Sequence, residues 1–254
     1  MNTKGNTILI TGGGSGIGRG LAERFHKLGN KVIIAGRRAS VLDEVTRANP
    51  GMASAVLDIE KPESISQLGA KIAADFPSLN ILINNAGIMR AEKLTADQPS
   101  VADAEAIVTT NLLGPIRLIA ALLPHLRKQP HSTIVNVSSG LAFVPLSVTP
   151  TYCATKAAIH SYTQSLRYQL KDTTTEVIEI VPPYVQTDLM NGAEDPRAMP
   201  LADFIAEVMQ LFQSQPEAKE ILVERVKGLR FAAENKAYDA TFNTLNAHLT
   251  AENL

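Results

Sequence analysis

The hydrophobic positions of the chain fall into short apolar runs that alternate with longer stretches of helical periodicity. Several runs, such as "TILI" and "KVIIA", are apolar at almost every position, which is typical of strands buried on both faces of a sheet. The expected strands are Thr7–Ile10, Lys31–Ala35, Ala53–Leu57, Ile81–Asn84, Thr133–Val137 and Glu176–Val181, with a weaker seventh at Glu220–Glu224. The expected helices span 16–28, 39–48, 62–76, 100–128, 151–171, 201–214 and 229–247.

This alternation predicts an α/β fold, a doubly wound parallel sheet of about seven strands with helices on both faces. No linker, repeat or low-complexity tract interrupts the pattern, so residues 1–254 are expected to form one domain. The stretch 186–200 lacks clear periodicity and is expected to be a loop.

Composition narrows the functional classes. Of the 254 residues, 45% are hydrophobic and 19% are charged, which suits a large core and argues against disorder. The net charge of -1, with the charges interspersed, argues against a nucleic-acid or anionic-membrane partner. The start "MNTKGN" does not read as a signal peptide and no run of 18 apolar residues occurs, so we expect a cytoplasmic protein. Cys153 is the single cysteine, and the five histidines lack metal-ligand spacing, so we predict no disulfide and no metal site.

The segment "TGGGSGIG" at 11–18 lies between an expected strand and an expected helix. Glycines in such a turn allow a tight bend and a close approach to a pyrophosphate, and the amides of the following helix start bind anions. The turn therefore predicts a Rossmann-type NAD(P)-binding domain, although a glycine-rich turn without a ligand is the alternative. The expected cofactor contacts here are Gly12, Gly14, Ser15, Gly16, Ile17 and Gly18.

The end of the second strand indicates which dinucleotide is bound. An NAD site places an Asp or Glu there, about 20 residues after the glycines, whereas this chain has Gly36 followed by Arg37 and Arg38. A guanidinium matches a phosphate through paired hydrogen bonds, so NADP (NADPH) is favoured over NAD. The alternative for one of the two arginines, Arg38, is a solvated surface charge.

Taken together, the motifs resemble the short-chain dehydrogenase/reductase family, in its single-domain branch. The resemblance covers roughly residues 7–190. It rests on "TGGGSGIG", Asp58, "NNAG" (84–87), Asn111, "SS" (138–139), "YCATK" (152–156) and "PPYVQT" (182–187). A weaker likeness to the DltE-like oxidoreductases rests on "SGLAF", "YCATKAAIHS" and the double proline.

The resemblance implies that Tyr152 is the general acid–base, that Lys156 lowers its pKa and bonds the nicotinamide ribose, and that Ser139 holds the substrate oxygen. Asn111 would hold a water in a proton relay. A phenol with a pKa of about 10 is a poor base at neutral pH, and a nearby ammonium favours its ionised form. Structural alternatives are a turn role for Ser139, a kink-capping amide for Asn111, and a surface pair for Tyr152 and Lys156.

The same resemblance implies the remaining cofactor contacts. Asp58 and Ile59 would flank the adenine, and Asn85, Ala86 and Gly87 would follow the adenosine ribose and pyrophosphate. Pro182, Val185 and Thr187 would lie at the nicotinamide end, with Thr187 bonding the carboxamide. Asn84 is expected to tie neighbouring strands.

Two departures from the family pattern affect substrate and assembly. Pro182–Pro183 replaces the common proline–glycine pair, and the usual "VDGG" ending is missing. We therefore expect a homodimer through 100–128 and 151–171, with a tetramer as the alternative. The expected substrate pocket has no arginine clamp and consists of Leu141, Phe143, Val144, Tyr184, Val185, Leu189 and Met190.

These features predict an NADP-dependent oxidoreductase acting on a small, mostly apolar carbonyl or secondary alcohol. Nucleotide-sugar epimerases and dehydratases share YxxxK, but they usually carry a longer C-terminal domain than the roughly 65 residues that follow Thr187. An NADP-binding redox-sensing regulator is the other alternative, although a sensor has no need of an acid–base tyrosine.

Overall fold

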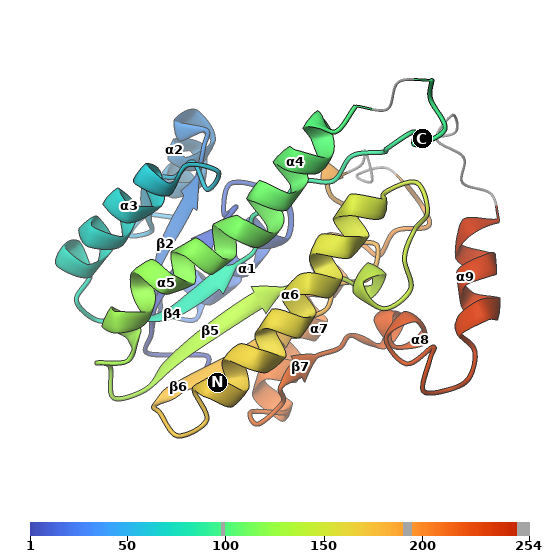
Figure 1. The fold of residues 1–254 in the computed structure, drawn as a ribbon. Helices are drawn as coiled ribbons and strands as arrows, with labels where there is room; N and C mark the ends of the chain where they lie inside the picture. Colours follow the sequence, from blue (N-terminus) through green and yellow to red (C-terminus); the bar gives the residue numbers. More distant parts are fainter. Residues whose placement is uncertain (98–99, 190–194, 248–254) are drawn as a thin grey trace.

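A seven-stranded parallel sheet forms the centre of the computed structural model, which describes residues 1–97, 100–189 and 195–247 (Figure 1). The strand order is β3-β2-β1-β4-β5-β6-β7. The strands are β1 (Thr7–Thr11), β2 (Lys31–Gly36), β3 (Ala53–Val56), β4 (Leu79–Asn84), β5 (Ser132–Val137), β6 (Thr175–Ile180) and β7 (Glu220–Ile221). The predicted doubly wound α/β fold is confirmed.

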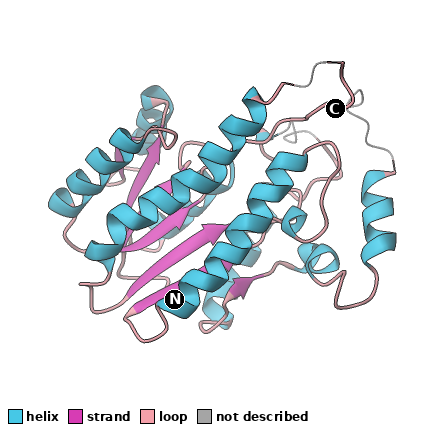
Figure 2. Cartoon of the chain, in the orientation of Figure 1, coloured by secondary structure: helices cyan, strands magenta, loops and turns pink. Residues whose placement is uncertain are grey.

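Helices cover both faces of the sheet, as the secondary-structure colouring in Figure 2 shows. One face packs against α1 (Gly16–Lys27), α2 (Ala39–Ala48) and α7 (Leu201–Ser214). The other packs against α3 (Pro62–Asp75), α5 (Gly114–Leu126) and α6 (Pro150–Gln169). Neighbouring strand residues alternate between the two layers: Ile8 and Ile10 join the first, and Leu9 joins the second.

The strand order reverses between β1 and β4, because the chain runs outward to β3 and then returns past β1. In open parallel sheets, ligands bind outside the carboxyl ends of the strands at such a point. The two strand ends are joined here: the Thr11 hydroxyl accepts the backbone N–H groups of Asn85 (3.0 Å) and Ala86 (3.1 Å). The topology therefore places the glycine turn beside "NNAG".

The helix predicted over 100–128 is interrupted. It comprises α4 (Ala102–Val108), a π-helical segment η1 (Thr109–Leu113) and α5. Asn111 lies inside the π-helical turn, a feature that often occurs at functional sites. By length and composition alone, Ala102–Leu126 could span a membrane, the one such helix among the described residues. Its buried side chains, including Leu118 and Leu122, cover the sheet instead.

The prediction of one helix over 229–247 is wrong. The chain forms a short 3-10 turn, η4 (Glu224–Val226), then α8 (Lys227–Arg230), and resumes helix only in α9 (Tyr238–Asn246). Between them Lys236 has a φ of 57°, and the N–H groups of Lys236 and Ala237 bond back to the carbonyls of Ala233 and Ala232. These two hydrogen bonds have the Schellman pattern and close the turn after α8, with a lysine in the left-handed position where glycine is usual.

The last strand is also shorter than predicted, since β7 ends at Ile221. The segment after it packs on the turn that follows β5: a Cβ added at Gly140 would lie 2.8 Å from Leu229 and 2.9 Å from Val226. Helix α9 lies at the edge of the molecule beyond α8 (Figure 1) and has no buried residue. It is tied to the body through Asn246, whose side chain bonds Pro145 O and Ser147 N.

Candidate active site

The glycine turn has the backbone geometry that its sequence predicts. Gly12 and Gly16 have φ values of 68° and 50°, which residues other than glycine rarely adopt. A Cβ on Gly18 would lie 2.3 Å from the carbonyl oxygen of Gly12, so α1 packs directly on the turn. Gly14, Ser15 and Ile17 lie on the same turn and are partly exposed. A Cβ on Gly16 would approach Thr187 to 3.2 Å, which places the far end of the site beside the turn.

The predicted adenosine end lies at the carboxyl ends of β2 and β3. Arg37 is 57% exposed, and its Nη1 donates to Glu60 Oε1 at 3.1 Å. Glu60 also accepts the Thr110 hydroxyl at 2.9 Å, so this carboxylate is held beside the arginine. Arg38 is exposed and precedes α2 directly. Arg37 is therefore accessible, but a carboxylate already bonds part of its guanidinium.

Asp58 and Ile59 also lie at this end. The Asp58 N–H donates to Ser64 Oγ at 3.0 Å, and Asp58 Oδ1 accepts the Glu60 N–H at 3.2 Å. Ile59 is buried against Gly114, where an added Cβ would lie 2.6 Å from the isoleucine. Both residues lie just after the end of β3, and their adenine-flanking role stays a prediction.

The "NNAG" residues connect the glycine turn to Asn111. The Asn85 side chain donates to Thr11 O at 3.0 Å, while a Cβ on Gly87 would meet Asn111 Oδ1 at 3.2 Å. Asn111 exchanges two hydrogen bonds of 2.8 Å with the backbone of Ile88. Asn84 instead donates to Asn136 on the neighbouring strand at 2.9 Å, the strand-tying contact that the sequence suggested.

Four predicted catalytic residues converge next to this strand edge. Asn111, Ser139, Tyr152 and Lys156 are between 2% and 7% exposed. Lys156 lies one turn after Tyr152 on α6, and its Nζ lies 5.5 Å from the centroid of the Tyr152 ring. Ser139 begins the 3-10 turn η2 (Gly140–Ala142), where its hydroxyl accepts Leu141 N at 3.1 Å. A small cavity touches both Asn111 and Lys156.

Burial shifts both titratable groups toward their neutral forms. It raises the pKa of the Tyr152 phenol well above its ordinary 10, and the hydrogen bond with the Ser139 side chain offsets only part of that rise. Burial lowers the pKa of Lys156 to about 8, against an opposing effect of the Glu179 carboxylate. The Lys156 ammonium donates to Val137 O at 2.9 Å. The sequence suggested that Lys156 lowers the pKa of Tyr152, whereas in this structure burial raises it.

The predicted nicotinamide end is formed by the segment after β6. Pro182 and Val185 are buried, and Pro182 O accepts Gly140 N at 2.8 Å, next to Ser139. Val185 pairs with Met199 in an isolated bridge, which closes the base of the 186–200 loop. Thr187 lies against Gly16. The segment from Pro182 to Thr187 therefore connects the turn at Ser139 and Gly140 with the glycine turn.

Apolar residues surround Tyr152. Tyr152 packs in a cluster with Ile107 and Cys153, which is bordered by Ile88, Met89, Leu141 and Leu146. Of the predicted pocket residues, Val144 and Val185 are buried in the protein, whereas Tyr184 and Leu189 are 42% and 38% exposed. Phe143 is partly buried, and Met190 lies outside the described residues.

Two supporting residues were not identified from the sequence. Glu92 accepts both the N–H (2.9 Å) and the hydroxyl (2.7 Å) of Thr151, which fixes the start of α6 one residue before Tyr152. Glu179, on β6, is fully buried and acts electrostatically on Lys156. Both contacts join segments that are far apart in sequence, and neither carboxylate belongs to a local motif.

The fold and this site define an oxidoreductase of the Rossmann-like α/β class. The model of the short chain dehydrogenase family matches residues 6–198, and the chain belongs to that family. It is 40% identical over 249 residues to the "uncharacterized oxidoreductase DltE" of Bacillus subtilis (strain 168), with 97% of this chain and 98% of that one covered.

A second relative and a solved structure agree with this family assignment. The NADP-dependent 3-hydroxy acid dehydrogenase YdfG of Shigella flexneri is 33% identical over 176 residues, which cover 69% of this chain and 71% of that protein. The crystal structure of a short chain dehydrogenase from Burkholderia cenocepacia J2315 in complex with NADP superposes with a TM-score of 0.82 at 26% identity. It covers 95% of this chain and 99% of that chain. The predicted family and the likeness to DltE-like oxidoreductases are confirmed.

Proposed function

We propose that the protein is an NADP-dependent oxidoreductase that interconverts a small, mostly apolar carbonyl compound and the corresponding secondary alcohol. The observation that carries the proposal is the burial of Ser139, Tyr152 and Lys156 together, beside Asn111. Burying a phenol, an ammonium and two further polar side chains is costly unless they are paired or used. Their position at the carboxyl edge of the sheet, opposite the glycine turn, suits catalysis on a bound dinucleotide.

The residues of the turn fit such a cofactor. Gly12 and Gly16 have positive φ values, and a Cβ at Gly12, Gly16 or Gly87 would crowd neighbouring protein atoms, so the backbone itself forms the surface of the turn. No side chain caps the start of α1, and the amides of a helix start suit an anion. When bound, the dinucleotide supplies or accepts the hydride. The protein's own residues then have to hold the substrate oxygen and move one proton.

Tyr152 suits the role of proton donor in the reducing direction. Its raised pKa keeps the phenol protonated at neutral pH, so it can protonate the oxygen of a carbonyl as charge develops there. Ser139 would donate a second hydrogen bond to the same oxygen. In the oxidising direction Tyr152 must lose its proton, which the positive charge of Lys156 favours. Asn111, bonded to Ile88, would hold a water behind Lys156.

The proposed preference for NADP rests on Arg37. The β2 strand ends in Gly36 without a carboxylate, and the exposed guanidinium of Arg37 follows directly. The NADP dependence of the Shigella relative and the NADP in the Burkholderia complex support the same choice.

The proposed substrate class rests on the surroundings of Tyr152. Ile88, Met89, Leu141 and Leu146 are apolar and lie about the tyrosine. Arg230, in the C-terminal segment, is already engaged: its guanidinium bonds Glu220 and lies 4.5 Å from the Phe143 ring centroid. An uncharged ketone or aldehyde therefore suits the site better than a carboxylate.

The test is NADPH oxidation measured against panels of ketones, aldehydes, quinones and 3-oxo acids, beside calorimetric binding of NADPH. We expect turnover with uncharged ketones or aldehydes, and its loss in Tyr152→Phe. Tight NADPH binding without turnover on any panel would overturn the catalytic proposal and favour a sensor. Turnover confined to 3-oxo acids would overturn the proposed substrate class.

A further inference from the structure

A row of polar side chains crosses four strands of the sheet beneath α6. Asn84 on β4 pairs in register with Asn136 on β5, Asn136 pairs with Glu179 on β6, and Glu179 pairs with Glu220 on β7. Paired residues in register point to the same face. Asn84 donates to Asn136 and Asn136 donates to Thr163, while Asn84 Oδ1 has no partner among the described residues. Glu179 is a carboxylate with no exposed surface.

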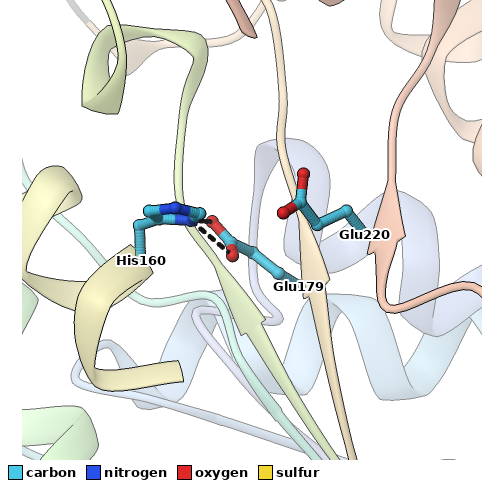
Figure 3. A group of neighbouring side chains, drawn as sticks. All are labelled: His160, Glu179 and Glu220. Atoms are coloured by element: carbon cyan, nitrogen blue, oxygen red, sulfur yellow. Dashed lines mark hydrogen bonds and ion pairs between the residues drawn. The ribbon is translucent and has the colours of Figure 1, made fainter. Parts of the chain in front are cut away.

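Glu179 is held in place by α6. His160 Nδ1 lies 2.9 and 3.1 Å from its two carboxylate oxygens, as the dashed lines in Figure 3 show. Gln164 bonds the other ring nitrogen of His160 at 3.0 Å, and the Phe143 ring packs edge-on against the imidazole at 4.7 Å between centroids. The Gln164 amide nitrogen faces Nε2, an arrangement in which Nδ1 is free to donate to the carboxylate. His160 therefore fixes the position of the Glu179 carboxylate against α6.

The neighbouring carboxylate, Glu220, is paired with Arg230. His160, Glu179 and Glu220 place ligand atoms within 4.8 Å of one another, a spacing that could suit a metal ion. Arg230, however, donates to both oxygens of Glu220 at 2.7 and 3.2 Å. The charge of Glu220 is thus balanced by an arginine, and the cluster does not require a metal ion.

Two cationic side chains of α6, Arg167 and Lys156, interact electrostatically with Glu179. Arg167 donates to the carbonyls of Val177 (2.8 Å) and Lys219 (2.9 Å), so backbone oxygens hold its guanidinium.

Lys156 lies one helical turn before His160, is 6% exposed, and donates to Val137 O at 2.9 Å. Val137 follows Asn136, the residue that pairs with Glu179, so the ammonium reaches the strand next to Glu179. Burial lowers the pKa of Lys156, and a carboxylate on the adjacent strand opposes that effect.

We propose that Glu179, oriented by His160, is a positioning residue that keeps the Lys156 ammonium charged at working pH. The proposal rests on the proposed function of Lys156 in cofactor binding and catalysis. It gives a role to a buried carboxylate that makes no direct contact with the reacting groups. Glu179 acts through Lys156 alone.

The direct test is a carbon-13 NMR titration of the lysine Cε atoms in the whole protein, with the Lys156 signal assigned by its loss in Lys156→Gln. In Glu179→Gln the His160 bond can persist while the charge is removed, so the Lys156 titration moves to lower pH. Glu220→Gln is the matched control, because it removes a carboxylate one strand away whose charge Arg230 balances. We expect the control to leave the Lys156 titration unchanged.

The kinetic readout follows from the same shift. A half-unit displacement of the Lys156 pKa from about 8 would lower turnover about threefold at pH 8.5 and by less than about 1.3-fold at pH 6.5. A merely structural role would lower turnover equally at both pH values. If Glu179→Gln does not fold, Glu179→Asp is the second test. The shorter side chain moves the carboxylate away from Lys156, so the Lys156 titration should still move to lower pH.

The outcomes separate this inference from the proposed function. An unchanged Lys156 titration in the Glu179 variants contradicts the inference, even when the protein turns over ketones normally. A downward shift in a protein that reduces no carbonyl compound supports the electrostatic role of Glu179 and overturns the proposed function. An equal shift in Glu220→Gln contradicts the inference, because the effect would then be general.

Discussion

Replacing Glu60 by glutamine should tighten the binding of NADPH. Glu60 Oε1 accepts a hydrogen bond from Arg37 at 3.1 Å, on the side of β2 where we propose that Arg37 meets the 2′-phosphate of NADP. A carboxylate beside a phosphate site both competes for the guanidinium and repels the ligand. Glutamine removes that charge, while its amide oxygen can still accept the Thr110 hydroxyl, which Glu60 binds at 2.9 Å.

The expected magnitude is modest because the pair is solvent-exposed. Arg37 and Glu60 are 57% and 32% exposed, and exposed ion pairs contribute about 0.2–1 kcal/mol. Releasing Arg37 should therefore strengthen NADPH binding by up to about fivefold. NADH, which has no 2′-phosphate, serves as the internal control and should change by less than about twofold.

The matched variant is Arg37→Ala. In the unmodified protein we expect NADPH to bind at least about tenfold more tightly than NADH, which equals 1.4 kcal/mol, and Arg37→Ala should remove most of that preference. Calorimetry with both cofactors on all three proteins measures each step. Equal affinities in the unmodified protein, or a preference that survives in Arg37→Ala, would refute the reasoning.

Two further predictions concern the lysine and the assembly. Lys156→Ala should weaken both NADPH binding and turnover. In the direction of alcohol oxidation its residual turnover should rise toward alkaline pH, where the phenol ionises unaided. In the unmodified protein NADPH binding should weaken as pH rises past about 8, because the charged form of Lys156 is lost there; calorimetry across pH checks the sign. We also expect a two-fold dimer built on α4–α5 and α6, whose surfaces expose Leu113 and Tyr168. A monomer in micromolar light scattering would contradict this, whereas a tetramer with the same interface would correct only the count.

Local patterns predicted the fold, and they indicated candidate site residues that the structure brings together. Strands buried on both faces show as short apolar runs, and glycine spacing reports backbone conformation directly, as the positive φ values of Gly12 and Gly16 show. The family resemblance also placed Asn111, Ser139, Tyr152 and Lys156, which the structure brings together. Each of these features depends on a motif of a few consecutive residues.

The features that the sequence did not predict depend on backbone detail or on distant partners. The apolar pattern of 100–128 continues through the π-helical turn at Asn111, so periodicity could not show the interruption. The turn that closes at Lys236 between α8 and α9 has a left-handed lysine where glycine is the usual signal. Glu92 and Glu179 contact α6 from a loop and a strand that are distant in sequence, and only the folded chain joins them.

The pKa of Tyr152 shows how tertiary structure changes a local inference. The one-turn spacing from Lys156 suggested a lowered pKa, but burial dominates and raises it, while the ammonium bonds Val137 O. Spacing on a helix determines which side chains are neighbours. It does not determine how far water is excluded from them or which distant carbonyl receives the ammonium.

The central claim is that Tyr152 transfers the proton. The measurement that tests it most directly compares kcat and the NADPH Kd of Tyr152→Phe with those of the unmodified protein, using any alcohol or ketone found to turn over. Phenylalanine keeps the ring among Ile107 and Cys153 and removes only the hydroxyl. We predict that kcat falls by about 10² or more while the NADPH Kd stays within about twofold. Near-normal turnover in Tyr152→Phe would contradict the account.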